Sequence, residues 1–268
     1  MNRFLLVLLL LVPSGLSAQD NPNYNPDYDG NGCYSINDIL GLLPLFGTCV
    51  DTTPAFPCGD SVLFDGYWYE TVLIGEQCWF AENLRTTVYT NGDVIPAVIG
   101  DGLGVMTEGA TTVYGDGNYC DSTFSEGFDA CDEVQSLSEY GRLYNWLAVD
   151  DERGLCPTGW HVPADGEWTQ LEDYITSQGF AGIEGTALKS TTGWSNNDNG
   201  TNDFGFSGLP SGECWIYGGF WLAGVAGSWW SSSSVGCYAL YRGLGAGPEI
   251  HRGAFEPEMG RSLRCLRD

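Results

Sequence analysis

Short apolar runs alternate with glycine-rich polar segments over residues 58–268, and few of these runs are long or strictly periodic. Two of them, residues 62–64 and 67–74, flank the dipeptide Asp65-Gly66. Both residues of this dipeptide tolerate positive φ angles, which a two-residue turn between antiparallel strands requires. The pattern therefore predicts a tight β-hairpin at this point.

One amphipathic helix is predicted between Asp165 and Gly179. Its apolar positions, at helical spacing, are Trp168, Leu171 and Ile175. Asp165 is placed to cap the helix N-terminus, Glu167 falls in the first turn, and Gly179 is placed to end the helix. We expect the three apolar side chains to face the core.

Three later segments, residues 204–210, 229–233 and 238–242, have the pattern of short strands separated by glycine turns. No internal repeat is present in the sequence. The chain from Cys58 to Asp268 reads as one domain, and its length of about 200 residues is enough to bury a hydrophobic core.

The first 18 residues have the layout of a secretory signal peptide. Arg3 precedes an apolar run over residues 4–12, and small residues follow up to Ala18. This run is shorter than the roughly 20 residues that a transmembrane helix needs, and no second run of this kind follows. We expect a secreted protein without a membrane span, located outside the cell, at its surface or in the periplasm.

Composition divides the rest of the chain into three parts. Residues 19–51 hold an Asn/Asp/Gly-rich stretch followed by an apolar run, and residues 52–57 form a short linker that contains two prolines. Residues 58–268 form the large domain.

A calcium loop of the EF-hand type is predicted in residues 19–51. Its positions one, three, five, seven and twelve are Asp27, Asp29, Asn31, Cys33 and Asp38. Calcium binds oxygen ligands at about 2.4 Å, so short acidic and amide side chains at alternate positions suit it, with a backbone carbonyl at position seven. The spacing resembles one half of a dockerin, followed by a helix over residues 36–46. The alternative is an Asn/Gly-rich linker whose acidic residues bind nothing.

Ten cysteines, an even number, occur in a chain expected to enter an oxidising compartment. This favours structural disulfides over zinc ligands or catalytic thiols. No pair of cysteines has the CxxC spacing, which also disfavours zinc and redox chemistry.

The chain carries 35 acidic and 10 basic residues, with a formal net charge of −25. We do not expect the protein to bind nucleic acid, because neutralising the phosphates requires clustered Lys and Arg. Strong acidity favours solubility and attracts divalent cations. Most of these carboxylates are expected to be solvated surface groups.

Aromatic residues are abundant, with 10 tryptophans and 14 tyrosines. Most are expected in the core, because large aromatic side chains fill loop-rich domains efficiently. The tryptophans expected to be most exposed lie in Gly/Asn/Ser-rich loops and are Trp194, Trp215 and Trp221. Stacking of a sugar ring on one of these side chains is the ligand-binding hypothesis, and a core role is the alternative.

Several motifs occur in a fixed order: residues 77–85, 140–146, 154–163, 205–210 and 260–268. With them, roughly residues 58–268 resemble the Fibrobacter succinogenes major paralogous domain family of secreted bacterial proteins. That family is similar to the sulfatase-modifying-factor branch of the C-type lectin-like fold. The resemblance implies an α+β domain with small antiparallel sheets, one or two helices and long loops, and with its two ends brought together.

The resemblance and sequence proximity together favour four disulfides in the large domain: Cys58 with Cys78, Cys120 with Cys131, Cys214 with Cys237, and Cys156 with Cys265. A fifth bridge, between Cys33 and Cys49, would clamp the calcium loop to its helix. Spacing alone leaves the connectivity open. The sugar-binding tripeptides of C-type lectins do not occur in the sequence, so we do not expect their calcium-dependent sugar site.

No enzymatic activity is expected, because the sequence has no HExxH, GxSxG or phosphate-loop motif. His161 is expected to be buried and hydrogen-bonded. We expect a binding or surface-display protein for a glycan or a surface protein, with recognition by residues 86–139 and 192–235. The alternatives are a structural, matrix or filament protein that assembles with itself, and a polysaccharide-acting enzyme with a carboxylate pair.

Overall fold

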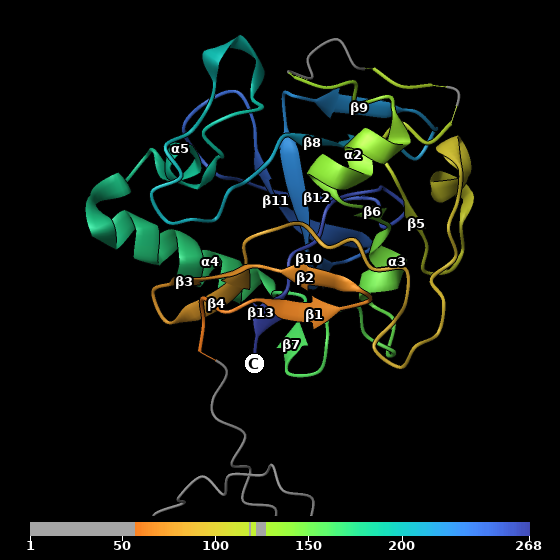
Figure 1. Ribbon diagram of the computed structural model, residues 1–268, viewed down its shortest axis with the longest axis horizontal. Helices are drawn as coiled ribbons and strands as arrows, with labels where there is room; N and C mark the ends of the chain where they lie inside the picture. Colours follow the sequence, from red (N-terminus) through yellow and green to blue (C-terminus); the bar gives the residue numbers. More distant parts are fainter. Residues whose placement is uncertain (1–56, 118, 122–126) are drawn as a thin grey trace, which may run out of the picture. The chain divides into compact units, whose positions relative to one another are not determined.

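The computed structural model describes residues 57–268 except residue 118 and residues 122–126 (Figure 1). The predicted signal peptide and calcium-loop module lie outside the described residues. So do all five predicted calcium ligands and the predicted bridge between Cys33 and Cys49.

The described part of the chain is a mixed α+β structure, which confirms the predicted fold class at this level. The strands are β1 (Val62–Phe64), β2 (Tyr67–Tyr69), β3 (Thr71–Ile74), β4 (Gln77–Phe80), β5 (Thr111–Thr112), β6 (Leu143–Tyr144), β7 (Trp160–His161), β8 (Ser211–Cys214), β9 (Phe220–Ala223), β10 (Gly227–Val235), β11 (Tyr238–Leu244), β12 (His251–Phe255) and β13 (Leu266–Arg267). The α-helices are α2 (Glu133–Tyr140), α3 (Trp146–Val149), α4 (Asp165–Ile175) and α5 (Glu184–Leu188). Short helical segments of other types are Gly100–Val105, Thr176–Phe180 and Ser195–Asn197.

Two larger sheets form the framework. One is five-stranded, in the order β12-β11-β10-β8-β9, and the other is four-stranded, in the order β3-β4-β13-β7. In the five-stranded sheet β8 runs parallel to β10, and the other neighbours are antiparallel. The four-stranded sheet pairs β4 with β13, so the beginning and the end of the large domain meet, as expected.

The predicted hairpin at Asp65-Gly66 is confirmed. β1 and β2 pair in antiparallel register, and φ is 46° at Asp65 and 74° at Gly66. The run over residues 67–74 is not one strand, however. At Glu70 the chain leaves the hairpin, because the Glu70 backbone N–H donates to the Glu82 carboxylate and its carbonyl accepts from Ala81. β3 then joins the four-stranded sheet.

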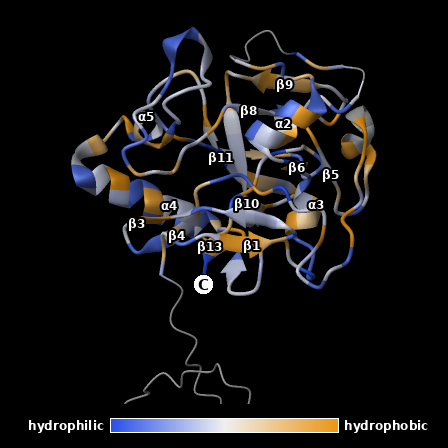
Figure 2. Cartoon of the chain, in the orientation of Figure 1, coloured by the Kyte–Doolittle hydropathy of each residue, from blue (hydrophilic) through white to orange (hydrophobic). Residues whose placement is uncertain are grey.

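The predicted helix is α4, and its three apolar residues are buried as expected. The predicted cap is wrong. Ala164 occupies the N-cap position, and its backbone N–H donates to the Glu167 carboxylate at 2.7 Å. Asp165 is instead held by ion pairs with Arg242 and Arg252. In Figure 2 hydrophobic and hydrophilic residues alternate along α4, as an amphipathic helix requires.

Two of the three later strands are confirmed, since residues 229–233 lie in β10 and residues 238–242 in β11. The strand predicted over residues 204–210 is wrong. In this segment the Asn202 side chain accepts a hydrogen bond from the Ser207 backbone N–H at 2.7 Å, and only Gly208 makes an isolated bridge, to Lys189. Side-chain bonding to the backbone competes here with a strand ladder.

Three of the four predicted disulfides of the large domain are confirmed: Cys58 with Cys78, Cys120 with Cys131, and Cys156 with Cys265. The third closes a loop of 109 residues and ties the segment before β7 to the one before β13. Covalent links thus reinforce the junction at which the two ends of the large domain meet.

The predicted bridge between Cys214 and Cys237 is wrong, since the two are not joined. Cys214 ends β8, whose Gly212 pairs with Gly227 at the start of β10. Cys237 follows β10, which ends at Val235. The parallel register places Cys214 level with Trp229, six residues before the end of β10 at Val235. Because a strand advances about 3.3 Å per residue, the two thiols lie roughly 20 Å apart. The Cα atoms of a disulfide lie only about 4.4–6.8 Å apart.

Candidate binding cleft

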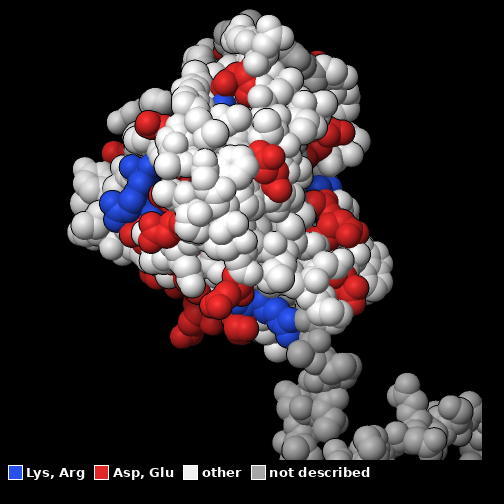
Figure 3. Space-filling view, turned by 90° about the vertical axis from the view of Figure 1, so that its left-hand side faces the viewer, with Lys and Arg blue, Asp and Glu red and all other residues white. Residues whose placement is uncertain are grey.

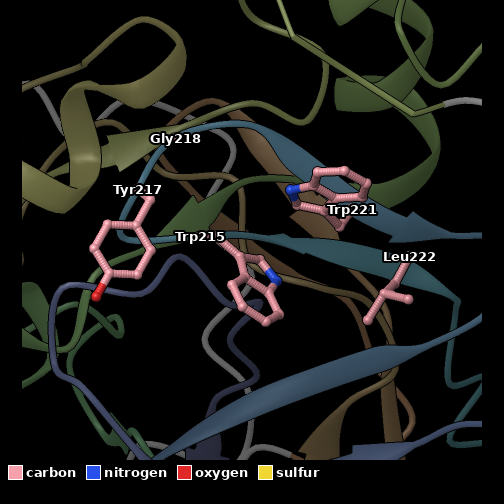
Figure 4. Close-up of a pocket in the computed structure, with 5 residues that line it drawn as sticks. All are labelled: Trp215, Tyr217, Gly218, Trp221 and Leu222. Atoms are coloured by element: carbon pink, nitrogen blue, oxygen red, sulfur yellow. The ribbon is translucent and has the colours of Figure 1, made fainter.

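An apolar cleft of about 430 Å³ opens at the hairpin of β8 and β9. Its lining residues are Trp215, Tyr217, Gly218, Trp221 and Leu222. Figure 4 shows that three aromatic rings from this single hairpin surround the opening, with Leu222 on one side. We call this feature the aromatic cleft.

The hairpin is shaped by a tight turn over residues 215–219. The Gly218 N–H donates to the Trp215 carbonyl at 2.9 Å, and the Trp215 N–H donates to the Gly219 carbonyl at 3.1 Å. Gly218 and Gly219 have φ angles of 85° and 87°, which residues other than glycine rarely adopt. A Cβ atom at Gly219 would also lie 2.5 Å from the Tyr119 ring. The two glycines therefore allow this hairpin to present its aromatic residues.

Trp215 is held on two sides. Its indole N–H donates to a carboxylate oxygen of Glu213 at 2.9 Å. Its ring meets the Phe255 ring edge to face, with centroids 6.2 Å apart. The side chain is nevertheless 37% exposed, so one part of the indole is fixed while another faces solvent.

Behind Trp215, Glu213 forms a buried ion pair. Its second oxygen accepts a hydrogen bond from Arg261 at 2.6 Å. The guanidinium also lies 3.8 Å from the centroid of the Tyr241 ring and donates to Ser228 at 2.6 Å. Burial lowers the pKa of Arg261, and the Glu213 charge opposes this effect. Glu213 thus links the cleft to the interior of the domain.

Trp221 is supported by a separate part of the chain. Its ring packs against Tyr119 with centroids 5.1 Å apart. The Tyr119 segment is tied to β9, since the Phe220 N–H donates to the Tyr119 carbonyl at 3.2 Å. The adjacent disulfide between Cys120 and Cys131 fixes the same segment. Tyr119 is itself exposed and extends the aromatic surface.

Leu222 has an unusual backbone conformation for a branched residue, with φ at 71°. Its carbonyl accepts hydrogen bonds from Val225 and Ala226, both at 2.9 Å, which tighten the turn after β9. Such a conformation costs of order 1–3 kcal/mol and persists where its surroundings enforce it, often at binding sites. This backbone conformation places the apolar Leu222 side chain, which is 38% exposed, at the cleft.

The structure brings together two of the three tryptophans singled out in the sequence. Trp215 and Trp221 both line the cleft, and both reach solvent at least in part. The expectation for Trp194 is wrong. This residue is buried, its indole N–H donates to Ser190 and Gly208, both at 3.1 Å, and the Lys189 ammonium lies 4.6 Å from its ring centroid.

Sequence reasoning missed three contributors to this surface, namely Tyr119, Tyr217 and Leu222. Tyr217 is 88% exposed, more than any other large hydrophobic residue in the described part of the chain. The signal for Tyr217 was its place between Trp215 and two glycines, which is a turn pattern. The two regions expected to carry recognition, residues 86–139 and 192–235, meet where Tyr119 packs on Trp221.

The chain matches the model of the Fibrobacter succinogenes major domain over residues 72–267. It belongs to this family. All residues that line the aromatic cleft fall inside the matched range. Comparisons with curated proteins and with solved structures find no match.

Several residues of the motifs noted in the sequence, such as Asn83 and Arg264, lie in the interior. Asn83 accepts hydrogen bonds from Trp229 at 2.8 Å and from Arg264 at 3.1 Å, and donates to the Tyr140 carbonyl at 2.9 Å. Burial lowers the pKa of Arg264 to about 9, while neutral acceptors such as the Ser207 carbonyl, at 2.9 Å, satisfy its guanidinium. These residues form a buried hydrogen-bond network, so their role in the described structure is to hold the scaffold together.

His161 is hydrogen-bonded as expected but is only partly buried. Its Nδ1 lies 2.6 Å from Asp268 and its Nε2 lies 3.0 Å from Glu167. Burial alone would lower the pKa of His161, but the hydrogen bonds to Asp268 and Glu167 outweigh it and raise the pKa. Because Glu167 also caps α4, His161 joins this helix to the C-terminal strand region.

The described residues contain no group of three or more His, Cys, Asp or Glu side chains placed to hold a metal ion. Within the same part of the chain, no helix has the length and apolar character needed to span a membrane. Acidic side chains are scattered over the face shown in Figure 3, and several basic side chains lie next to them. This surface agrees with the acidic composition.

Proposed function

We propose that this protein is a secreted, non-enzymatic binding protein that recognises an extracellular ligand through the aromatic cleft. The observation that carries the proposal is the cleft itself, where three aromatic rings of one hairpin are presented to solvent. Large aromatic side chains contribute most to binding when they are part of an exposed cluster rather than scattered singly.

The lining of the cleft supports binding rather than catalysis. Among the described residues, those that line it include no carboxylate, histidine, cysteine or lysine. Glu213, which lies behind Trp215, is committed to Trp215 and to Arg261. Both of its carboxylate oxygens are thus already engaged by neighbouring side chains.

At a finer level, we propose that the large domain has a C-type lectin-like fold. The pairing of β4 with β13 and the disulfide between Cys156 and Cys265 support this, because both join the two ends of the domain. An experimental structure whose strand connections differ from those of C-type lectin-like domains would contradict it.

We also propose that calcium stabilises the N-terminal module through Asp27, Asp29, Asn31, the Cys33 carbonyl and Asp38. Oxygen ligands at this spacing are typical of calcium loops. Calcium titration of the full mature chain, followed by calorimetry, tests this. We expect one bound calcium in the wild type and none in the Asp27→Ala/Asp29→Ala variant. Absence of binding at millimolar calcium would contradict the proposal.

Screening the mature chain on arrays of glycans and extracellular proteins tests the binding proposal. The Trp221→Ala variant should bind any captured ligand at least about 10-fold more weakly, which corresponds to about 1.4 kcal/mol. Trp68→Ala is the matched control, because Trp68 is 60% exposed but lies outside the cleft. If both variants bind like the wild type, the cleft is not the recognition surface.

A further inference from the structure

We infer that the aromatic cleft takes a neutral polysaccharide, whose sugar rings stack their apolar faces on the tryptophan and tyrosine side chains. This inference rests on the proposed function and narrows its ligand to one chemical class. Three properties of the cleft support this inference: its size, the fixed positions of its aromatic rings, and the absence of charged groups among the described residues that line it.

Size separates a sugar chain from a protein partner. The cleft has a volume of about 430 Å³ and five lining residues. Pockets for small ligands have volumes of roughly 300–1,000 Å³. A stable protein interface instead uses about 20–30 residues on each side. The cleft therefore fits one or a few rings of a chain molecule and is too small to be the core of a protein interface.

The rings are fixed before a ligand arrives. Trp215 is held by the Glu213 carboxylate and the Phe255 ring, and Trp221 is held by the Tyr119 ring. A rigid flat surface suits a rigid flat ligand face, because little conformational entropy is lost on binding. Adaptable surfaces that bind varied peptides are instead rich in flexible side chains such as methionine.

The negative charge of the protein favours neutral glycans over anionic ones. The chain has a formal net charge of −25, and no cationic side chain is among the described residues that line the cleft. The nearby Arg261 is buried and neutralised by Glu213. A sulfated or uronate-rich glycan would meet repulsion from the whole molecule without a compensating cation. A neutral glycan meets no such opposition.

Affinity electrophoresis in native gels tests the inference with neutral polysaccharides of different backbones and with one charged polysaccharide, carboxymethyl cellulose, which shares its β-glucan backbone with hydroxyethyl cellulose. The mature chain is run through neutral hydroxyethyl cellulose, xylan or mannan, and through carboxymethyl cellulose. We expect retardation by at least one neutral polymer. Where the β-glucan backbone is bound, the carboxymethylated form should bind at least 10-fold more weakly at low salt, and added salt should narrow the difference.

Variants assign the effect to the cleft. Trp215→Ala and Trp221→Ala should abolish retardation, Trp215→Phe should retain part of it, and Trp68→Ala should leave it unchanged. Unaltered thermal unfolding of each variant excludes misfolding as the cause.

Stronger binding to the charged polymer, or binding that persists in both cleft variants, would overturn the inference. If the cleft captures only proteins or peptides, the inference fails while the proposed function stands. If no probe of any kind binds in a cleft-dependent manner, both fail.

Discussion

At the scale of single residues, the contact that best explains the cleft is the one between Glu213 and Arg261. The pair is buried, and Glu213 uses its other oxygen to orient Trp215. A buried ion pair contributes little net stability compared with apolar packing, but removing one partner leaves an uncompensated charge in the interior. Glu213 is thus both a structural and a positioning residue.

We expect Glu213→Ala to destabilise the domain by about 3–5 kcal/mol, since Arg261 would remain buried without its partner. Glu152→Ala, which removes an exposed carboxylate, should change stability by no more than about 0.5 kcal/mol. Urea unfolding of both variants checks this. Equal stability of the two variants would show that the ion pair is not important for folding.

Gly219 provides a second test at this scale. Gly219→Ala would strain a φ angle of 87° and place a Cβ atom 2.5 Å from Tyr119. Gly236→Ala is the matched control, because its φ angle is 61° and its surroundings are open. Both variants should lose about 1–2 kcal/mol of stability from backbone strain. Only Gly219→Ala should lose more than this and also weaken ligand binding, as measured by unfolding and by affinity electrophoresis.

At the scale of elements, the disulfide between Cys120 and Cys131 fixes the segment that supports Trp221. Its sequence separation is 11, so chain-entropy arguments give a stabilisation of about 3 kcal/mol. Replacing both cysteines by alanine should lower the unfolding free energy by up to this amount and weaken binding. Replacing Cys58 and Cys78 should destabilise the domain without a specific effect on binding. Equal binding losses in the two variants would argue against a direct role of the Tyr119 segment.

Elements with a strong local signal were predictable from the sequence. The hairpin at Asp65-Gly66 and helix α4 follow from turn chemistry and from helical spacing, which act over a few residues. The strand prediction for residues 204–210 was wrong because the apolar residues of this segment suit a strand, whereas its Ser207 backbone N–H donates to the Asn202 side chain instead. The prediction that Trp194 is exposed was wrong for a related reason. Its polar sequence neighbours are typical of a loop, but tertiary contacts bury its side chain.

The cleft was only partly predictable. Trp215 and Trp221 were identified from their loop composition, but their contacts with Phe255 and Tyr119 join residues distant in sequence. No local pattern encodes such contacts. The Cys214 and Cys237 pairing failed in the same way, because proximity in sequence hid the length of β10 between them.

At the scale of the whole molecule, His161 links pH to stability at the point where the ends of the large domain meet. Its pKa is raised in the folded state, above an ordinary value of about 6.5. The protonated form is therefore favoured by folding. Its contribution is fully present below about pH 6.5 and is lost as pH rises through the higher folded value.

We therefore expect the stability difference between the wild type and His161→Gln to shrink as pH rises from below 6.5 through the raised pKa of His161. Urea unfolding of both proteins over this pH range measures it. A difference that stays constant, or that grows with pH, would show that the protonated histidine does not hold Asp268 and Glu167 together.

We propose that the aromatic cleft, on its disulfide-reinforced scaffold, binds a neutral glycan. Calorimetric titration of a neutral oligosaccharide, chosen from the polymer that retards the protein, tests it most directly in the wild type, Trp221→Ala and Trp68→Ala. Saturable binding with one site in the wild type and Trp68→Ala, and none in Trp221→Ala, is the predicted result. Equal affinity in all three proteins would show that the aromatic cleft is not the glycan-binding site.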